Sequence, residues 1–153
     1  MEISPDAAAL LVEEFAAAGA DEGTIWLIDE ARRALTPVWN SGPHAEAFVG
    51  RHSQPLSVGL VSLVFMTGQA LCENRVYWHA GQDPTLDHSL GLLTCSMIVV
   101  PLCIRGEACG VVSCVKLKRA DSEEPDPPPF TAADLARITG AVQRLGCEMD
   151  RNV

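Results

Sequence analysis

The chain has 153 residues, a length typical of one domain with a single hydrophobic core. Hydrophobic residues make up 48% of it and charged residues 20%, an ordinary globular composition that excludes a disordered or fibrous class. The formal net charge of −9 leaves no basic footprint for phosphate backbones or anionic lipids, so neither nucleic acid nor a membrane is an expected partner.

The N-terminus and the apolar segments predict a cytoplasmic protein. The chain begins Met1-Glu2-Ile3-Ser4-Pro5-Asp6, without the positive charge that opens a secretory signal. The longest stretch without a charged residue, 89–104, is shorter than the roughly 20 residues that span a bilayer. The six cysteines are scattered through apolar segments, so we interpret them as buried free thiols rather than as a disulfide framework.

The first third of the chain predicts a helix followed by a β-hairpin. Ser4 is a suitable N-cap, and apolar residues then recur at helical spacing until Gly19 ends the helix. Residues 24–29 and 35–40 have the composition of strands, and the polar run between them is typical of a turn. A short helix is predicted over 45–49.

The middle of the chain predicts a helix, a short strand and an irregular segment. Residues 60–66 are apolar at helical period, and Gly68 lies where such a helix would end. Residues 70–73 are short enough to be a strand. The following segment, 74–93, is rich in polar and aromatic residues, and loops of that kind often carry function. We therefore expect one helical turn and the functional site there.

The clearest hairpin is predicted over 96–104 and 108–117. Both runs are almost continuously apolar, which is typical of strands covered on both faces. Cys103 and Cys109 flank the turn between them. A two-residue turn would place these cysteines on opposite faces, whereas a three-residue turn would place them directly across from each other and permit a disulfide.

The last segment predicts a mobile loop and a long helix. Residues 118–129 are acidic and rich in proline, so they are expected to form a mobile surface loop, and 130–150 are expected to form the C-terminal helix. Thr131 and Asp134 have the spacing of a capping box, with Asp in place of the usual Glu.

An apolar seam runs along this helix at steps of three and four residues. Its members are Leu135, Ile138, Val142, Leu145 and Met149. The spacing fits packing on the chain's own sheet or against a second copy, and we predict a homodimer through the terminal helices. Gly140 weakens a helix, so a close backbone approach is expected there.

Two stretches resemble the GAF domain. The run from Gly91 to Leu102, followed by Arg105-Gly106-Glu107 and Gly110-Val111-Val112, is similar to the family's hairpin of an apolar strand with proline, a glycine turn and a second strand. The stretch 56–71 is similar to its glycine-containing helix, although Ser62 stands where a second glycine is common.

The resemblance covers the chain from about Ala7 to Met149 and implies a single α+β domain over 1–153. Its fold would be a central, mostly antiparallel sheet of about five or six strands with helices on both faces. In such domains a small ligand lies over the sheet, walled by the segment before the long hairpin, here 74–96.

The candidate ligand-binding residues on that segment combine aromatic, charged and hydroxyl groups. They are Tyr77, Trp78, Asp87, His88, Thr94 and Ser96. The aromatic pair would stack on a planar ligand, Asp87 would fix an amine, and the two hydroxyls would aim into the pocket. The alternative interpretation is that the aromatic pair caps the core and that the others are loop surface or strand-end hydrogen bonds.

We therefore predict a non-catalytic domain that senses a small molecule in signal transduction and acts through a partner protein or across its own dimer. No cofactor or metal is expected. One alternative is a ligand-free dimerisation module. Another is a cysteine-dependent reductase of free methionine sulfoxide, a GAF-fold enzyme, but Val61 stands here where that enzyme places a cysteine.

Two further ligand classes follow from the resemblance alone. Lys116, Phe130 and Asp134 are similar to a signature of cyclic-nucleotide-binding members, with Val115 in place of its Asn. The same residues already have structural explanations as a helix cap and an apolar staple. Haem or a pigment would require a histidine such as His79 or His88 as its ligand.

Overall fold

The computed structural model describes residues 3–151, which form one six-stranded antiparallel sheet with helices on both faces. The elements are α1 (Pro5–Ala17), β1 (Glu22–Ile28), β2 (Ala34–Asn40), α2 (Ala45–Phe48), β3 (Gln54–Pro55), α3 (Leu60–Thr67), β4 (Leu71–Glu73), the 3-10 helix η1 (Val76–Trp78), α4 (Thr85–Leu90), β5 (Leu92–Ile104), β6 (Glu107–Arg119) and α5 (Ala132–Arg151). The strand order is β3-β2-β1-β6-β5-β4. This architecture confirms the predicted α+β fold.

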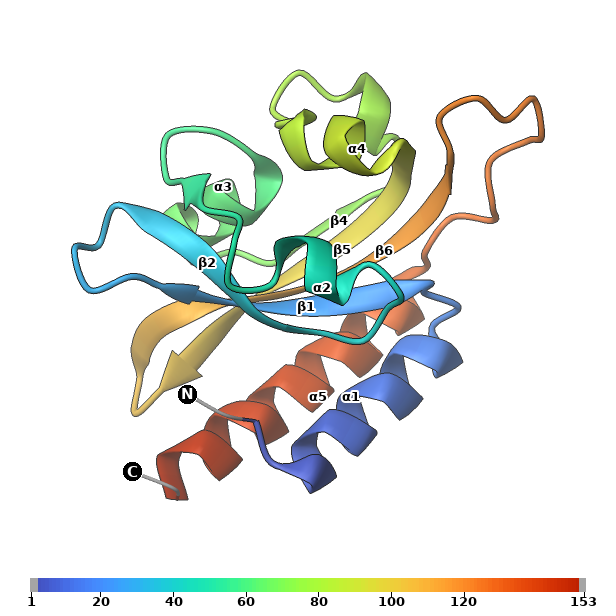
Figure 1. Cartoon of the computed structure of the whole chain (residues 1–153). Helices are drawn as coiled ribbons and strands as arrows, with labels where there is room; N and C mark the ends of the chain where they lie inside the picture. Colours follow the sequence, from blue (N-terminus) through green and yellow to red (C-terminus); the bar gives the residue numbers. More distant parts are fainter. Residues whose placement is uncertain (1–2, 152–153) are drawn as a thin grey trace.

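The helices form two layers, one on each face of the sheet (Figure 1). The two terminal helices, α1 and α5, lie side by side on one face, and α2, α3 and α4 lie on the other. Each face has its own apolar core. Ile98 and Val112 belong to the core under α1 and α5, whereas Trp26, Val64 and Val99 belong to the core under α3.

The N-terminal helix begins and packs as its sequence predicts. Ser4 Oγ accepts a hydrogen bond from the Ala7 backbone N–H at 3.1 Å and so caps α1. Leu11 and Phe15 are buried against the sheet. The Phe15 ring lies so close to Gly23 of β1 that a Cβ at that position would be 2.2 Å from it. Glycine at position 23 is therefore what lets α1 approach the sheet.

The long hairpin of β5 and β6 has a two-residue turn. Arg105 and Gly106 adopt φ values of 53° and 77°, the left-handed conformation of a tight hairpin turn. Ile104 pairs with Glu107 and Cys103 pairs with Ala108. Cys103 and Cys109 are both free thiols. The two-residue alternative is thus the one that the structure adopts.

A β-bulge near the start of β5 changes which side chains face which layer. Thr94 pairs with Leu117 and Ser96 pairs with Lys116, so Cys95 is the extra residue between two consecutive pairs. From Ser96 onward, even-numbered residues such as Ile98 face α1 and α5. Because the bulge inserts one residue, Thr94 lies on the opposite face from Ser96.

The C-terminal helix begins with the predicted capping box. The Thr131 N–H donates to Asp134 Oδ2 at 2.8 Å, and the Asp134 N–H donates to Thr131 Oγ1 at 3.1 Å. This helix, α5, has 20 residues and is the longest in the structure. No helix within residues 3–151 combines the length and the apolar character needed to cross a bilayer.

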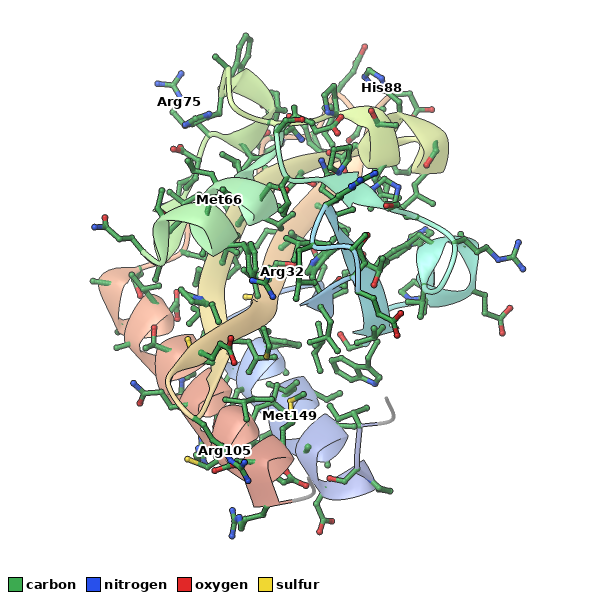
Figure 2. The ribbon with its side chains drawn as sticks, turned by 90° about the vertical axis from the view of Figure 1, so that its left-hand side faces the viewer. Arg32, Met66, Arg75, His88, Arg105 and Met149 are labelled. Atoms are coloured by element: carbon green, nitrogen blue, oxygen red, sulfur yellow. The ribbon has the colours of Figure 1, made fainter. Side chains whose placement is uncertain are left out.

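The apolar seam of α5 packs within the chain rather than on a second copy. Ile138, Val142 and Leu145 are at most 2% exposed in the core shared with α1 and the sheet. Met149 also packs there, between α5 and α1 (Figure 2). The seam therefore gives no support for a dimer, because intrachain packing accounts for it.

The chain itself makes no close approach at Gly140, because the space around that residue is open. The close approach lies six residues further on. A Cβ on Gly146 would be 2.5 Å from the backbone oxygen of Cys103, so glycine at position 146 brings α5 against β5.

The acidic, proline-rich segment is shorter than predicted and is fastened at its C-terminal end. Residues 118 and 119 belong to β6, so the loop begins at 120. Lys116 Nζ donates to the Pro128 oxygen at 2.8 Å. The Asn74 side chain donates to the Phe130 oxygen at 3.0 Å and accepts from its N–H at 2.9 Å. These hydrogen bonds place Phe130 at the start of α5.

Candidate functional site

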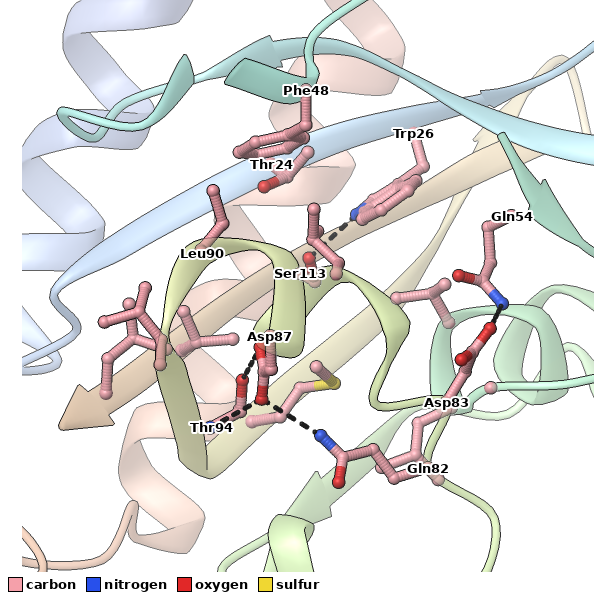
Figure 3. Close-up of a pocket in the computed structure, with 18 of the residues that line it drawn as sticks. Thr24, Trp26, Phe48, Gln54, Gln82, Asp83, Asp87, Leu90, Thr94 and Ser113 are labelled. Atoms are coloured by element: carbon pink, nitrogen blue, oxygen red, sulfur yellow. Dashed lines mark hydrogen bonds between the residues drawn. The ribbon is translucent and has the colours of Figure 1, made fainter. Parts of the chain in front are cut away.

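A cavity lies between the sheet and α4, on the face opposite the terminal helices (Figure 3). The centres of water molecules can move within about 90 Å³ of it. Because a cavity that just fits one water leaves the centre of that water almost no freedom, this volume has room for several waters or for a small ligand. Its polar lining residues are Glu22, Thr24, Gln54, Gln82, Asp83, Asp87, Thr94 and Ser113. Its apolar lining residues are Trp26, Phe48, Leu60, Val61, Leu86, Leu90, Leu92, Met97, Val115 and Leu117.

The floor of the cavity is made by the two central strands, β1 and β6. Glu22, Thr24 and Trp26 alternate along β1 toward this face, as side chains of a strand do. Trp26 Nε1 donates to Ser113 Oγ of β6 at 3.0 Å, and Asn40 Nδ2 donates to Thr24 Oγ1 at 2.9 Å. Both hydroxyl oxygens are held in place, and each retains its own O–H for a further acceptor.

The roof of the cavity is α4, and the Asp87 carboxylate of this helix holds it to the start of β5. Asp87 accepts hydrogen bonds from the Thr94 N–H at 2.8 Å and from Thr94 Oγ1 at 3.0 Å. Gln82 Nε2 donates to the same carboxylate at 3.2 Å (Figure 3). The chain leaves α4 through Gly91, whose φ of 68° is the left-handed conformation that ends many helices.

A second carboxylate fastens the loop before α4 to the other side of the cavity. Gln54 Nε2 donates to Asp83 Oδ2 and to the Val58 oxygen, both at 2.9 Å. Gly59, at the start of α3, has a φ of 95°, and a Cβ there would lie 2.9 Å from Gln54 Nε2. Glycine at position 59 therefore leaves room for the glutamine that links the roof to β3.

The charged groups of the wall are acidic, and their pKa values are shifted in different directions. Burial raises the pKa of Glu22, and interactions with His44 and Asn40 partly offset this increase. Burial also raises the pKa of Asp87, which the Thr94 hydrogen bonds oppose. Hydrogen bonds from Thr85 and Gln54 lower the pKa of Asp83. The two carboxylates with raised pKa are thus the desolvated ones.

Two of the six predicted site residues, Asp87 and Thr94, line this cavity. Ser96 does not, because the bulge at Cys95 turns it to the face of α1 and α5. His88 is an exposed residue at the outer side of α4 (Figure 2).

Tyr77 and Trp78 lie outside the cavity wall. Tyr77 Oη donates to Asp126 at 2.9 Å, and Lys118 Nζ lies 2.7 Å from the same carboxylate. Trp78 is 70% exposed and stacks at a tilt on Tyr77, with 5.3 Å between the ring centroids. Tyr77 therefore contacts the acidic loop rather than the cavity, and Trp78 packs on Tyr77.

The floor of the cavity is the main part of its wall that the sequence analysis did not predict. Glu22, Trp26 and Ser113 line the cavity, yet the predicted strand began at residue 24 and none of these three residues was among the predicted site residues. The alternation of Glu22, Thr24 and Trp26 was a usable signal. It shows that they share a face, but the sequence does not say which face carries the cavity.

The cysteines lie away from the cavity wall. Burial raises the pKa of Cys95 and of Cys109 to about 11, and that of Cys114 to about 12. Cys103 and Cys147 are exposed. Within residues 3–151, no group of three or more His, Cys, Asp or Glu side chains is arranged to hold a metal ion.

The residues that resemble the cyclic-nucleotide signature lie on the opposite face from the cavity. Lys116 donates to the Pro128 oxygen and lies 4.7 Å from the centre of the Phe130 ring. Asp134 caps α5. Their contacts fix the loop and the start of α5.

The fold and this cavity define an α+β domain with a partly polar chamber between the sheet and its outer helices. Residues 6–149 match the family model of the GAF domain. The chain belongs to the GAF domain family. This confirms the resemblance seen in the hairpin, and the match covers nearly the whole chain.

Solved structures similar to this chain include domains of several proteins. The GAF domain of a phosphoenolpyruvate-protein phosphotransferase from Coxiella burnetii has a TM-score of 0.74 at 16% identity, over 97% of this chain and 84% of that one. The free methionine-R-sulfoxide reductase of Neisseria meningitidis has a TM-score of 0.70 at 20% identity, over 96% and 78%. The second GAF domain of DevS from Mycobacterium smegmatis has a TM-score of 0.66 at 20% identity, over 95% and 92%. No curated protein matches the chain, and identities this low establish the fold alone.

Proposed function

We propose that this chain is a non-catalytic regulatory domain that binds a small molecule between the sheet and α4. The observation that carries the proposal is the cavity itself, whose wall combines apolar surface with oriented carboxylate, amide and hydroxyl groups. A site that selects a small ligand has this mixture of a mostly apolar wall and a few placed polar groups.

The sheet offers a direct mechanical route from the ligand to the terminal helices. Adjacent residues of one strand point to opposite layers, so Ser113 faces the cavity while Val112 and Cys114 lie in the core under α1 and α5. A ligand that binds one arrangement of β6 better than another would shift the population of the helix arrangements packed on its far side. A partner protein that contacts the terminal helices would then respond to the ligand.

A homodimer through the terminal helices stays a proposal and needs a surface other than the apolar seam. The seam residue Val142 is 2% exposed. The outward side of α1 carries Val12, which is 48% exposed, and would be available to a second copy. A ligand-free dimerisation module is the competing proposal, and it predicts a stability that does not respond to small molecules.

The reductase alternative has less support. A reductase of free methionine sulfoxide needs a thiolate near its substrate, and the cysteines lie outside the wall of this cavity. Burial holds Cys95 and Cys114 in the thiol form. Sustained reduction of free methionine sulfoxide in the presence of a dithiol reductant would contradict the non-catalytic proposal.

Thermal unfolding with a panel of small metabolites tests the proposal when a blocking variant is included. Leu90 of α4 lines the cavity, so Leu90→Trp is expected to fill part of it. Leu63 of α3 is 47% exposed, which makes Leu63→Trp a matched control on the same layer. A true ligand at 100 times its Kd adds about 2.7 kcal/mol of stability.

We expect at least one compound to raise the melting temperature of the wild-type protein and of Leu63→Trp but not of Leu90→Trp. A panel that raises none of them would favour the dimerisation module. Equal shifts in all three proteins would place the ligand elsewhere.

A further inference from the structure

The charged side chains that line the cavity are all acidic. Its wall, in the described part of the chain, contains three carboxylates and no lysine, arginine or histidine. Asp83 is occupied by Gln54 and Thr85, which donate to it at 2.9 Å and 2.6 Å. Glu22 and Asp87 are the carboxylates whose burial is incompletely compensated.

Glu22 is the most unusual of these groups. It is 7% exposed and lies on the face of β1 that forms the cavity floor. Its one ion-pair partner among the described residues is His44, which is charged only when protonated and whose Nδ1 lies 3.8 Å from Glu22 Oε2, outside hydrogen-bond distance. That nitrogen is itself buried without a hydrogen-bond partner. Burying a charged carboxylate without a paired cation raises the free energy of the folded protein, and a cation bound beside the carboxylate lowers it.

A second carboxylate of the wall, Asp87, can also accept a further hydrogen bond. Asp87 accepts three hydrogen bonds, but a carboxylate has about four acceptor positions and retains one. Ser113 and Thr24 already accept one hydrogen bond each. The indole N–H of Trp26 is used by Ser113, whereas both hydroxyls can still donate, so the preference for a cation rests on the carboxylates of the wall.

We infer that the cavity takes a compact organic cation, a small primary ammonium compound, with its charge held by Glu22. This inference rests on the proposed function and specifies the ligand class of the same site. The small size follows from the limited volume of the cavity. Charge-assisted hydrogen bonds to a carboxylate are short and roughly twice as strong as neutral ones.

Three probes that differ mainly in charge test this inference. They are n-butylammonium, butan-1-ol and butyrate, titrated separately into 15N-labelled protein while backbone resonances are followed by NMR. We expect resonances of the cavity residues, Thr24, Thr94 and Ser113 among them, to shift with n-butylammonium. Its Kd is expected to be at least tenfold lower than that of the alcohol, and butyrate is expected to bind more weakly still.

Two variants decide whether Glu22 is responsible. Glu22→Gln keeps the size of the side chain and removes its charge, and it is expected to reduce the preference for the cation over the alcohol to less than threefold. Glu123→Gln is the matched control, since Glu123 is an exposed loop residue outside the wall, and it is expected to leave the preference unchanged.

The outcomes separate the inference from the proposed function. Binding of the alcohol or of butyrate at the cavity as tightly as the cation, or an unchanged preference in Glu22→Gln, would overturn the inference and leave a sensory cavity for another ligand class. If none of the three probes shifts the resonances of the wall residues, the cavity does not accept small ligands whatever their charge, and the proposed function falls as well.

Discussion

Glu22 couples the stability of the fold to pH at a single residue. Because burial raises its pKa, the folded protein holds the Glu22 proton more tightly than the unfolded chain does. Folding is therefore favoured by this group at a pH below the unfolded pKa of about 4.3, and this contribution is lost as the pH rises through the folded pKa. The neighbouring charged groups are His44, which opposes the shift, and Asp21, which adds to it.

Replacing Glu22 is therefore expected to stabilise the unliganded protein. Glu22→Gln should have a higher melting temperature than the wild type at pH 7, and the difference should shrink as the pH is lowered toward 4.5. Thermal unfolding followed by circular dichroism across this range measures the effect, with Glu123→Gln expected to change little. A Glu22→Gln protein that is less stable at pH 7 would show that His44 and Asn40 compensate the buried charge fully.

At the scale of the element, α5 contains two glycines with opposite roles. A Cβ on Gly146 would collide with the backbone oxygen of Cys103, whereas nothing lies within 4 Å of a Cβ on Gly140. In a helix interior, glycine lowers stability by roughly 0.5–1 kcal/mol relative to alanine. At position 146 the close contact with Cys103 makes glycine more favourable than alanine.

The same substitution is thus expected to have opposite signs at these two positions. Gly140→Ala should raise the free energy of unfolding by about 0.5–1 kcal/mol, and Gly146→Ala should lower it by roughly 1–3 kcal/mol, as overpacking does. Urea denaturation of both variants measures the two changes. A stabilising Gly146→Ala would mean that α5 does not pack closely on β5.

Elements were predictable where their signals are local. The Ser4 cap, the box of Thr131 and Asp134 and the Arg105-Gly106 turn each specify a boundary within a few residues, and the structure forms all three. The bulge at Cys95 has no such signal. Simple alternation places Thr94 and Ser96 on one face, so a single inserted residue was enough to assign Ser96 to the cavity incorrectly.

At the scale of the whole molecule, the fold was more predictable than the site. The long apolar strands predict a sheet that is covered on both faces, and the terminal helix supplies one of the two covering layers. The cavity needs residues from distant parts of the chain, such as Glu22, Gln54 and Ser113, and no spacing in the sequence brings these together. The seam of α5 was ambiguous for a related reason, because steps of three and four suit an intrachain core and a dimer equally.

The two cores explain why the sheet can act as the link between the ligand and the helices. Trp26 and Val99 pack under α3, while Ile25 and Ile98, their neighbours in sequence, pack under α1 and α5. A change at the floor of the cavity therefore reaches both layers through the same strands. Under the proposed function, a ligand beneath α4 would act on the terminal helices through these strands.

Hydrogen–deuterium exchange with and without saturating n-butylammonium tests the cavity as the ligand site most directly. The account predicts slower exchange in 81–94, which contains the roof, in the floor segments around Trp26 and Ser113, and to a smaller extent in α1 and α5. Protection confined to the Tyr77 region and the loop from 120 to 131, or no protection of the roof at saturation, would contradict it.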